Sequence, residues 1–199
     1  MTKVKGLSVI QCREYIRARH GEHGVEQVRA AMEPEAREVV CADTLLPTDW
    51  IELAHALEHS RAFDGTFGKG DGQLVHEMIR EVTTRHMTGL YKSLIVGFSV
   101  DEMLERSSRL WNRYYDRGES QIEKLAENRL IKRILGCPDL PRHHDWLTSP
   151  YYEALLRYAG AKEISVKHIK CVANGANCCE TELRWRPART ESRPLGGPG

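Results

Sequence analysis

The sequence predicts an α+β fold, in which a helical N-terminal part packs on a small antiparallel sheet with strand-strand-helix-strand-strand order. Apolar residues recur at helical spacing through most of the first 118 residues. Two short strand-like runs follow, and the stretch 161–185 has the pattern of a β-hairpin. We therefore divide the chain into a helical part (1–118), an α+β part (119–186) and a polar, proline- and glycine-rich tail (187–199) that we expect to be disordered.

The N-terminal part shows helix signals throughout, and we expect it to contain no strands. Gly21 stands where a C-terminal cap belongs, and Ser99 and Glu102 form a capping box. Residues 61–72 contain four glycines, whose spacing fits neither a P-loop nor a dinucleotide fingerprint, so we expect a plain connecting loop. The expected helices cover residues 8–20, 25–32, the stretch opened by Leu46-Pro47-Thr48-Asp49, 74–86, 89–98 and 99–118.

The C-terminal part begins with two expected strands, residues 120–125 and 129–135, which are joined by a turn at Glu127-Asn128, although the pattern of 131–135 is equally compatible with a helix. A proline-punctuated loop comes next. Ser149 is then expected to cap a helix that has Pro150 in its first turn and ends at Gly160.

The final hairpin is expected to turn at Asn174-Gly175, a dipeptide that supplies the positive φ angles of a type I′ turn. Paired residue numbers then sum to 349. This register makes one face apolar and gives the other face complementary charges. It pairs Ile164 with Trp185, Val166 with Leu183, His168 with Thr181, Lys170 with Cys179, Lys167 with Glu182, Ile169 with Glu180 and Cys171 with Cys178. We expect Ile164, Val166, Leu183 and Trp185 to be core residues.

The composition excludes several classes of protein. The 199 residues carry a net charge of +1, which gives no electrostatic reason to expect nucleic acid or an anionic membrane as a partner. No apolar run approaches the roughly 20 residues that span a bilayer, and the N-terminus lacks a signal-peptide pattern. Six scattered cysteines are typical of reduced thiols, so we expect a cytoplasmic protein.

Three local patterns resemble a known group of domains. Lys5-Gly6 precedes a helix that ends at Gly21, Gly160-Ala161-Lys162 leads into the last hairpin, and 171–178 has the pattern C-x3-G-x2-C. With the element order, these features resemble haem nitric-oxide/oxygen-binding domains and 4-vinyl reductase-type small-molecule-binding domains. The chain also resembles an uncharacterised myxobacterial family of similar length. The resemblance implies a pocket between helices and sheet for a small apolar ligand, lined by Tyr91, Leu94, Met103, Leu110, Trp111 and Tyr114.

The chain departs from the haem-binding branch of this group in two places. That branch requires a proximal histidine on the helix before the sheet, and residues 99–118 contain none. It also uses a Tyr-x-Ser-x-Arg motif for the haem propionates, whereas Ile95 stands here where the arginine is required. We therefore expect no haem and no other cofactor.

Two groups of side chains are weak candidates for metal or redox chemistry. His55 and His59 are four residues apart on one helical face, but no H-E-x-x-H pattern is present and further ligands are lacking. A solvated helix face is the favoured interpretation. For Cys171 and Cys178, reduced structural thiols are favoured, and a redox-sensitive pair or a metal site stay as alternatives.

No nucleophile elbow, phosphate loop or paired acidic motif is present, so we do not expect an enzyme. The favoured function is a non-enzymatic sensor or binding module for a small apolar ligand, acting in bacterial signalling or regulation. One alternative is a scaffold protein that works as a homodimer without ligand, and another is a thiol- or zinc-dependent redox switch. We expect self-association in either case, because Tyr, Trp and Met residues occur on several helices and the net charge is near zero.

Overall fold

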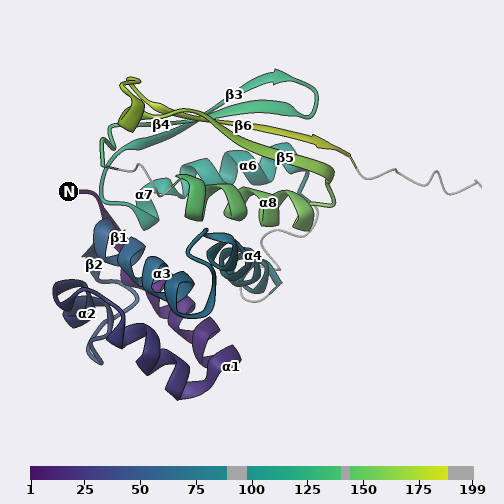
Figure 1. The fold of residues 1–199 in the computed structure, drawn as a ribbon. Helices are drawn as coiled ribbons and strands as arrows, with labels where there is room; N and C mark the ends of the chain where they lie inside the picture. The colour runs from purple at the N-terminus through teal and green to yellow at the C-terminus, as the bar shows by residue number, and fades with distance from the viewer. Residues whose placement is uncertain (89–97, 140–143, 188–199) are drawn as a thin grey trace, which may run out of the picture.

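The computed structural model of this chain describes residues 1–88, 98–139 and 144–187. A four-stranded sheet forms one side of the molecule, and two groups of helices lie beneath it (Figure 1). The elements are β1 (Lys3–Lys5), α1 (Gly6–Ala30), α2 (Pro34–Val40), β2 (Trp50–Glu52), α3 (Leu53–Phe67), α4 (Gln73–Thr88), α6 (Val100–Arg109), α7 (Trp111–Tyr114), β3 (Glu119–Ala126), β4 (Arg129–Leu135), a π-helical turn (His144–Thr148), α8 (Ser149–Tyr158), β5 (Lys162–Lys170), a 3₁₀ turn (Val172–Asn174) and β6 (Cys179–Arg186).

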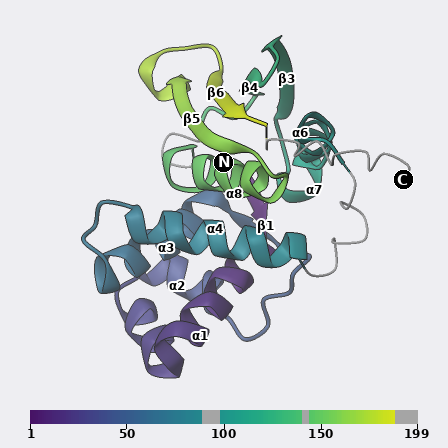
Figure 2. The same cartoon turned by 90° about the vertical axis from the view of Figure 1, so that its right-hand side faces the viewer.

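The predicted combination of helices with a small antiparallel sheet is confirmed. The sheet has the strand order β3-β4-β6-β5, and every neighbouring pair is antiparallel. Its inner face packs on α6 and α8, and α8 in turn contacts α4, so α8 lies between the sheet and the N-terminal helices (Figure 2). Within the described part of the chain, no helix is both long and apolar enough to cross a membrane.

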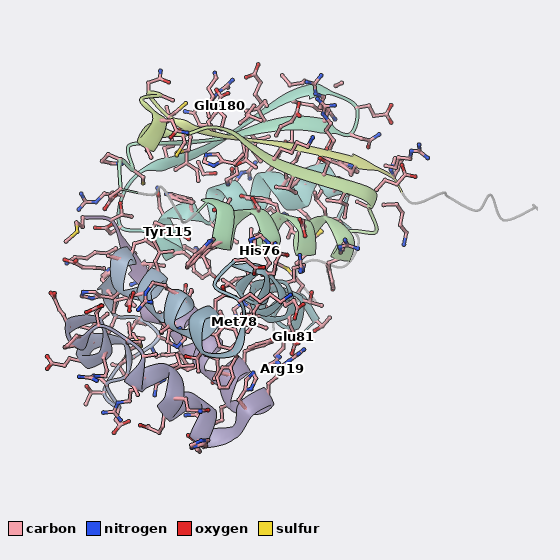
Figure 3. The ribbon with its side chains drawn as sticks, viewed as in Figure 1. Arg19, His76, Met78, Glu81, Tyr115 and Glu180 are labelled. Carbon is pink, nitrogen blue, oxygen red and sulfur yellow. The ribbon has the colours of Figure 1, made fainter. Side chains whose placement is uncertain are left out.

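The outer face of the sheet is a ladder of ion pairs. Arg133 on β4 donates a hydrogen bond of 2.8 Å to Glu180 on β6, and the Lys170 amine lies 3.0 Å from the same carboxylate. Arg129 pairs in the same way with Glu182 at 2.7 Å. Glu180 lies on the side of the sheet away from the helices (Figure 3). The charges on the outer face are therefore neutralised by ion pairs between neighbouring strands, and the opposite face of the sheet packs on the core.

The prediction that residues 1–118 contain no strands is wrong. Lys3–Lys5 pairs antiparallel with Trp50–Glu52, and the facing residues Val4 and Ile51 are both buried. Val4 also forms a bridge with Tyr115, where the chain leaves α7. Three-residue strands are too short to show a period of two, and they form only because distant segments meet.

Helix boundaries differ from the predictions where burial extends a helix. The backbone of α1 is interrupted at Gly21 (φ 68°, ψ −174°), the position predicted as a cap. The predicted loop 61–72 is wrong in its first half, because α3 continues to Phe67 and buries Phe63 completely. The segment 34–40, for which no element was predicted, forms a helix that starts at Pro34.

The capping box at Ser99 is confirmed. The Glu102 amide donates to the Ser99 hydroxyl at 3.3 Å, and the Ser99 amide donates to the Glu102 carboxylate at 2.8 Å. The helix ends at Arg109 and the short helix α7 follows it. The chain becomes extended at Tyr115, where it bridges to Val4, so no helix continues to 118. The segment 89–98 lies outside the described residues except for its last position.

The predicted cap at Ser149 is wrong. A π-helical turn runs directly into α8, so Thr148 already has helical dihedrals (φ −72°, ψ −46°) and no side chain caps the helix. Pro150 does occupy the first turn, as predicted.

The centre of the predicted hairpin register is confirmed, and its turn is wrong. Val166 faces Leu183, Lys167 faces Glu182 and His168 faces Thr181. The register then shifts by one residue, so that Lys170 faces Glu180, and Ile169 is left 48% exposed. Instead of a two-residue type I′ loop, a 3₁₀ turn over 172–174 leads to Gly175 at φ 85°.

The apolar core consists of two clusters of buried residues. One joins α1, α2, α3 and α4, and the other joins α6, α8 and the inner face of the sheet. Leu183 and Trp185 are buried in the second cluster, whereas Ile164 and Val166 pack against it and are only partly buried. The division of the chain at residue 118 stays a prediction, and the tail 188–199 lies outside the described residues.

Candidate functional site

A cavity of about 830 Å³ lies between the N-terminal helices and the layer formed by α6, α7, α8 and β4. Tyr115, one of its lining residues, lies between the two groups of helices (Figure 3). The structure places four of the residues named in the sequence analysis along this cavity: Met103, Leu110, Trp111 and Tyr114. Tyr91 and Leu94 lie outside the described residues. A cavity of this volume with mostly apolar walls has the dimensions of a small-molecule site.

The charged residues that line the cavity are all basic. They are Lys5 and Lys132 together with three arginines of α6 and the segment that follows it, Arg106, Arg109 and Arg113. No aspartate or glutamate occurs among the described lining residues. The guanidinium of Arg106 stacks over the Phe98 ring at 3.9 Å, which keeps one cation against an aromatic wall. The lining therefore favours a ligand with an apolar body and an acidic group.

Lys132 is the unusual member of this set, because its side chain is only 2% exposed. It is on β4 between Leu130 and Ile134, which point to the same face because side chains alternate along a strand. Its amine donates a hydrogen bond of 2.6 Å to the Ser120 hydroxyl on β3 and lies 4.7 Å from the centre of the Tyr152 ring on α8. Burial lowers the pKa of the Lys132 ammonium to about 7.

Lys132 was not among the predicted site residues, although the strand pattern contained a signal for it. In the predicted strand 129–135, the alternation places Leu130, Lys132 and Ile134 on one face and Arg129, Ile131 and Arg133 on the other. An apolar face with a lysine at its centre breaks the pattern, and such a break is typical of a functional position.

Tyrosines and one histidine supply the other polar groups of the cavity. Tyr152 forms a hydrogen bond with the Ser107 side chain, and burial raises the pKa of its phenol well above the ordinary value. Burial also raises the pKa values of Tyr115 and Tyr151. On α4, the His86 Nε2 atom contacts the Gln11 side-chain amide, and burial lowers the pKa of its imidazole. All of these groups are consequently uncharged near neutral pH.

A second site lies at the turn end of the hairpin. The ligating atoms of His168, Cys171 and Cys179 are all within 4.8 Å of one another, and both cysteines are buried. The Val172 amide donates to the Cys179 sulfur at 3.4 Å, and burial raises the pKa of the Cys179 thiol to about 11. Two thiols and one imidazole are a ligand set that zinc accepts, and they leave a fourth position open.

The predicted pairing of Cys171 with Cys178 does not describe this cluster. The register shift after His168 places Cys179, not Cys178, with Cys171. Cys178 is buried but is not part of the three-residue group. The cysteines are free thiols in the structure.

The histidines of α3 do not form a metal site with a third ligand in the described residues. His59 is 3% exposed, so the expected solvated face is wrong for this residue. Burial, together with the positive charge of Arg13, lowers the pKa of His59 to about 4. The Nε2 atom of His55 lies 3.9 Å from the exposed carboxylate of Glu35. The four-residue spacing brings both imidazoles to one side of the helix, where His55 lies near Glu35 of α2 and His59 near Arg13 of α1.

Comparison with known proteins identifies the fold of the chain but not a family to which it belongs. No protein-family model matches the chain, and neither does any curated protein sequence. Among solved structures, Fe(II) unliganded H-NOX from K. algicida is similar, with a TM-score of 0.66, 11% identity, and coverage of 93% of this chain and 98% of that one. An S. oneidensis H-NOX protein in the Fe(II)NO state has a TM-score of 0.68 and 10% identity, with coverage of 92% and 99%.

This chain has the H-NOX fold. An oxygen-binding H-NOX domain related to soluble guanylate cyclases agrees, with a TM-score of 0.62 and 12% identity over 92% of this chain and 96% of the other. Identities this low establish the architecture and leave ligand and activity open. The predicted resemblance to haem nitric-oxide/oxygen-binding domains is thus confirmed at the level of fold. The resemblance to 4-vinyl reductase domains and to a myxobacterial family has no support from these comparisons.

The described lining of the cavity lacks the proximal histidine that the haem-binding branch carries on the helix before the sheet. Haem iron needs an axial imidazole, thiolate, thioether or phenolate. From α6, the residues that line the cavity are Met103, Arg106, Ser107 and Arg109, which include one thioether and no imidazole. The histidine in the lining, His86 on α4, contacts the Gln11 side-chain amide through its Nε2 atom. Burial raises the pKa of the Cys12 thiol to about 12, and the buried tyrosines are also protonated.

Proposed function

We propose that this chain is a non-enzymatic sensor or binding module that takes a small, largely apolar molecule with an acidic group, and that it does so without haem. The supporting observation is the cavity of about 830 Å³ whose walls are mostly apolar and whose charged residues are all basic. An apolar body gains free energy by leaving water, and an acidic group gains from the arginines. Bacterial signalling or regulation is the setting proposed for such a module.

We infer an orientation for such a ligand from the arrangement of the charged residues. Arg109 is largely exposed, with 78% of its side chain accessible, whereas Lys132 is almost completely buried. The acidic group would therefore bind at the arginines, and the apolar body would extend toward Tyr152 and Lys132. In the opposite orientation the acidic group would lie in the buried part of the cavity and lose its hydration, which makes that orientation less favourable.

Two fluorescent probes test the pocket: the anionic 1-anilinonaphthalene-8-sulfonate and the neutral N-phenyl-1-naphthylamine. We expect saturable binding of both at one site per chain. Leu110→Trp should fill the cavity and weaken both probes at least about tenfold. The matched control is Leu125→Trp, which places the same side chain on an exposed position of β3 outside the lining. Equal binding in the two variants would contradict the pocket.

The charge preference has its own test. Arg106→Gln should weaken the anionic probe by about three- to tenfold and leave the neutral probe unchanged, because only the former pairs with a guanidinium. Arg129→Gln is the control, since Arg129 pairs with Glu182 on the outer face of the sheet. If Arg106→Gln weakens neither probe, the acidic group is not part of the ligand. Native mass spectrometry of the purified protein would identify any molecule that co-purifies.

We propose a metal- or thiol-dependent switch as the second candidate function. The observation that favours it is the group of His168, Cys171 and Cys179, with all ligating atoms within 4.8 Å. Titration with Co²⁺ should produce thiolate charge-transfer absorption, and Zn²⁺ should displace the Co²⁺. Cys179→Ser should abolish this absorption, while Cys178→Ser, next to it in the chain, should keep it. Absorption that is equal in both variants would exclude the site.

A further inference from the structure

The amine of Lys132 is a buried nucleophile at the cavity wall. Its side chain is 2% exposed and is one of the cavity-lining residues. Its hydrogen-bond acceptor, the Ser120 hydroxyl, is neutral. No ion pair involves Lys132 in the described part of the chain, although six other lysines and arginines of the sheet region pair with carboxylates. A lysine that is kept inside without a counter-ion is costly, and such positions are typical of lysines used as amines.

The surroundings of the amine favour its neutral form. Burial lowers the pKa of Lys132 to about 7, so about half of the amine is unprotonated at that pH. Along β4 its neighbours on the same face are Leu130 and Ile134, and across the sheet they are Ile122 on β3 and Thr181 on β6. None of these four side chains titrates. A desolvated lysine of this kind attacks carbonyl carbon, as lysines that form Schiff bases do.

The wall opposite the sheet is aromatic. The Lys132 amine lies 4.7 Å from the centre of the Tyr152 ring and 5.8 Å from the Trp111 ring. Trp111 itself stacks on Tyr115, with ring centres 3.9 Å apart. Flat unsaturated molecules pack well between such rings. The side-chain oxygen of Ser120 lies 2.5 Å from that of Ser108, which is partly exposed, so a line of hydroxyl groups runs from the amine toward the surface.

We propose that Lys132 captures an aldehyde on an apolar, unsaturated body as a reversible Schiff base. The amine nitrogen bonds to the carbonyl carbon, and the carbonyl π electrons pass to oxygen. A proton moves from nitrogen to that oxygen, which gives a carbinolamine. Loss of the hydroxyl group and of the remaining N–H proton as water leaves the C=N bond. One amine and one aldehyde thus give one imine and one water, and no oxidant or reductant is required.

This inference rests on the proposed pocket and names the chemical class of its ligand. The apolar walls provide the body with a binding site, and the exclusion of water around the imine slows its hydrolysis. An acidic group at the far end of the same molecule would meet Arg106 and Arg109. Binding would then depend on two features of the ligand: an aldehyde that reaches Lys132 in the buried part of the cavity, and an acidic group that meets the arginines near the surface.

The experiment uses trans-cinnamaldehyde with sodium cyanoborohydride, which reduces an imine to a stable secondary amine. Labelled protein is digested, and each lysine is followed by mass spectrometry. We expect one equivalent of adduct on Lys132, formed at pH 7 at least about tenfold faster than on any other lysine. Lys132→Met should remove the fast phase. Lys124→Met is the control, because Lys124 is an exposed lysine of the adjacent strand that pairs with Asp101.

The pH profile is the second measurement. Labelling of Lys132 should rise to its plateau through about pH 7, whereas that of exposed lysines should continue to rise toward about pH 10. The titratable side chains on the elements around the amine are Tyr152 on α8, His168 on β5, and the arginines of α6 and α7 that line the cavity. The profile of the Tyr152→Phe variant should be unchanged, because burial keeps the phenol protonated throughout this range.

Three results separate this inference from the pocket itself. Selective labelling that Lys132→Met removes, with binding of N-phenyl-1-naphthylamine retained in that variant, supports both. Binding of the neutral probe without selective labelling overturns the Schiff base and leaves the pocket. Labelling spread over exposed lysines at equal rates also overturns it. A melting temperature within a few degrees of the parent, measured for each variant, shows that the chain is folded in every case.

Discussion

The side-chain amine of Lys132 on β4 lies 4.7 Å from the centre of the Tyr152 ring on α8. Both residues are almost completely buried, and both line the cavity. Strand and helix are therefore joined at this point by a basic group that has no carboxylate partner in the described residues. A protonated amine in this position costs folding free energy, and the cost depends on pH.

Lys132→Met should stabilise the protein near neutral pH. In the folded chain the pKa of Lys132 is about 7, and in the unfolded chain it is about 10.5, so between these values the unfolded state binds more protons. The stability of the parent therefore rises with pH over this window. The advantage of Lys132→Met should grow by up to about 1.4 kcal/mol per unit as pH falls from about 10 to about 7, and stay constant below. Urea unfolding at pH 6, 8 and 10 measures it; equal differences at all three values would contradict the prediction.

Trp185→Ala should cost about 3–5 kcal/mol, because it removes a large buried side chain from the cluster beneath the sheet. That is a large part of the roughly 5–15 kcal/mol that holds a domain together. Ile169→Ala on the same hairpin is the control, since Ile169 is 48% exposed, and it should cost less than about 1 kcal/mol. Chemical unfolding of the two variants provides the comparison. Similar losses would show that Trp185 is not a core residue.

Hemin should not form a specific complex. The described cavity lining supplies no imidazole from α6, and His86 on α4 contacts Gln11. Titration followed in the Soret region should show only unspecific, non-saturable absorbance. A saturable one-to-one band would overturn the prediction. If that band were lost in His86→Ala, it would also identify the iron ligand.

Oxidation of the hairpin should join Cys171 to Cys179 and not to Cys178. The sulfur atoms of the first two lie within 4.8 Å of each other, and the register shift separates Cys178 from this group. Diamide treatment should raise the melting temperature of the parent and of Cys178→Ser, because a cross-link restricts the unfolded chain. The shift should be absent in Cys171→Ser and Cys179→Ser. Peptide mapping that found a 171–178 bond would refute this assignment.

Self-association stays a prediction that the structure does not test. The aromatic and methionine residues behind it include Met78, Met103 and Trp111, and these are buried in the monomer. The exposed large apolar side chains of the described residues are Met1, Leu46, Trp50, Leu125 and Ile169. Sedimentation velocity at tens of micromolar should show a dimer. A monomer alone at these concentrations would exclude the homodimer.

Features that depend on neighbouring residues could be predicted from the sequence alone. The capping box at Ser99 and Glu102 needs only residues within one helical turn. The centre of the hairpin register follows from alternation along two adjacent strands, and it was correct at Val166 and Leu183. In such cases the partners are close in the chain, so sequence spacing and spatial contact correspond.

Other features were decided by the tertiary structure, because their partners are distant in the chain. The pairing of β1 with β2 requires two three-residue segments to meet, and neither has a pattern of its own. The register shift that brings Cys179 to Cys171 lies between His168 and Lys170, where the alternation of residues along the strand gives no sign of it. The sequence determined that Lys132 shares a strand face with Leu130 and Ile134. Only the packing of α8 and α7 over that face made it a desolvated amine at a cavity wall, since desolvation is set by every element that covers a group.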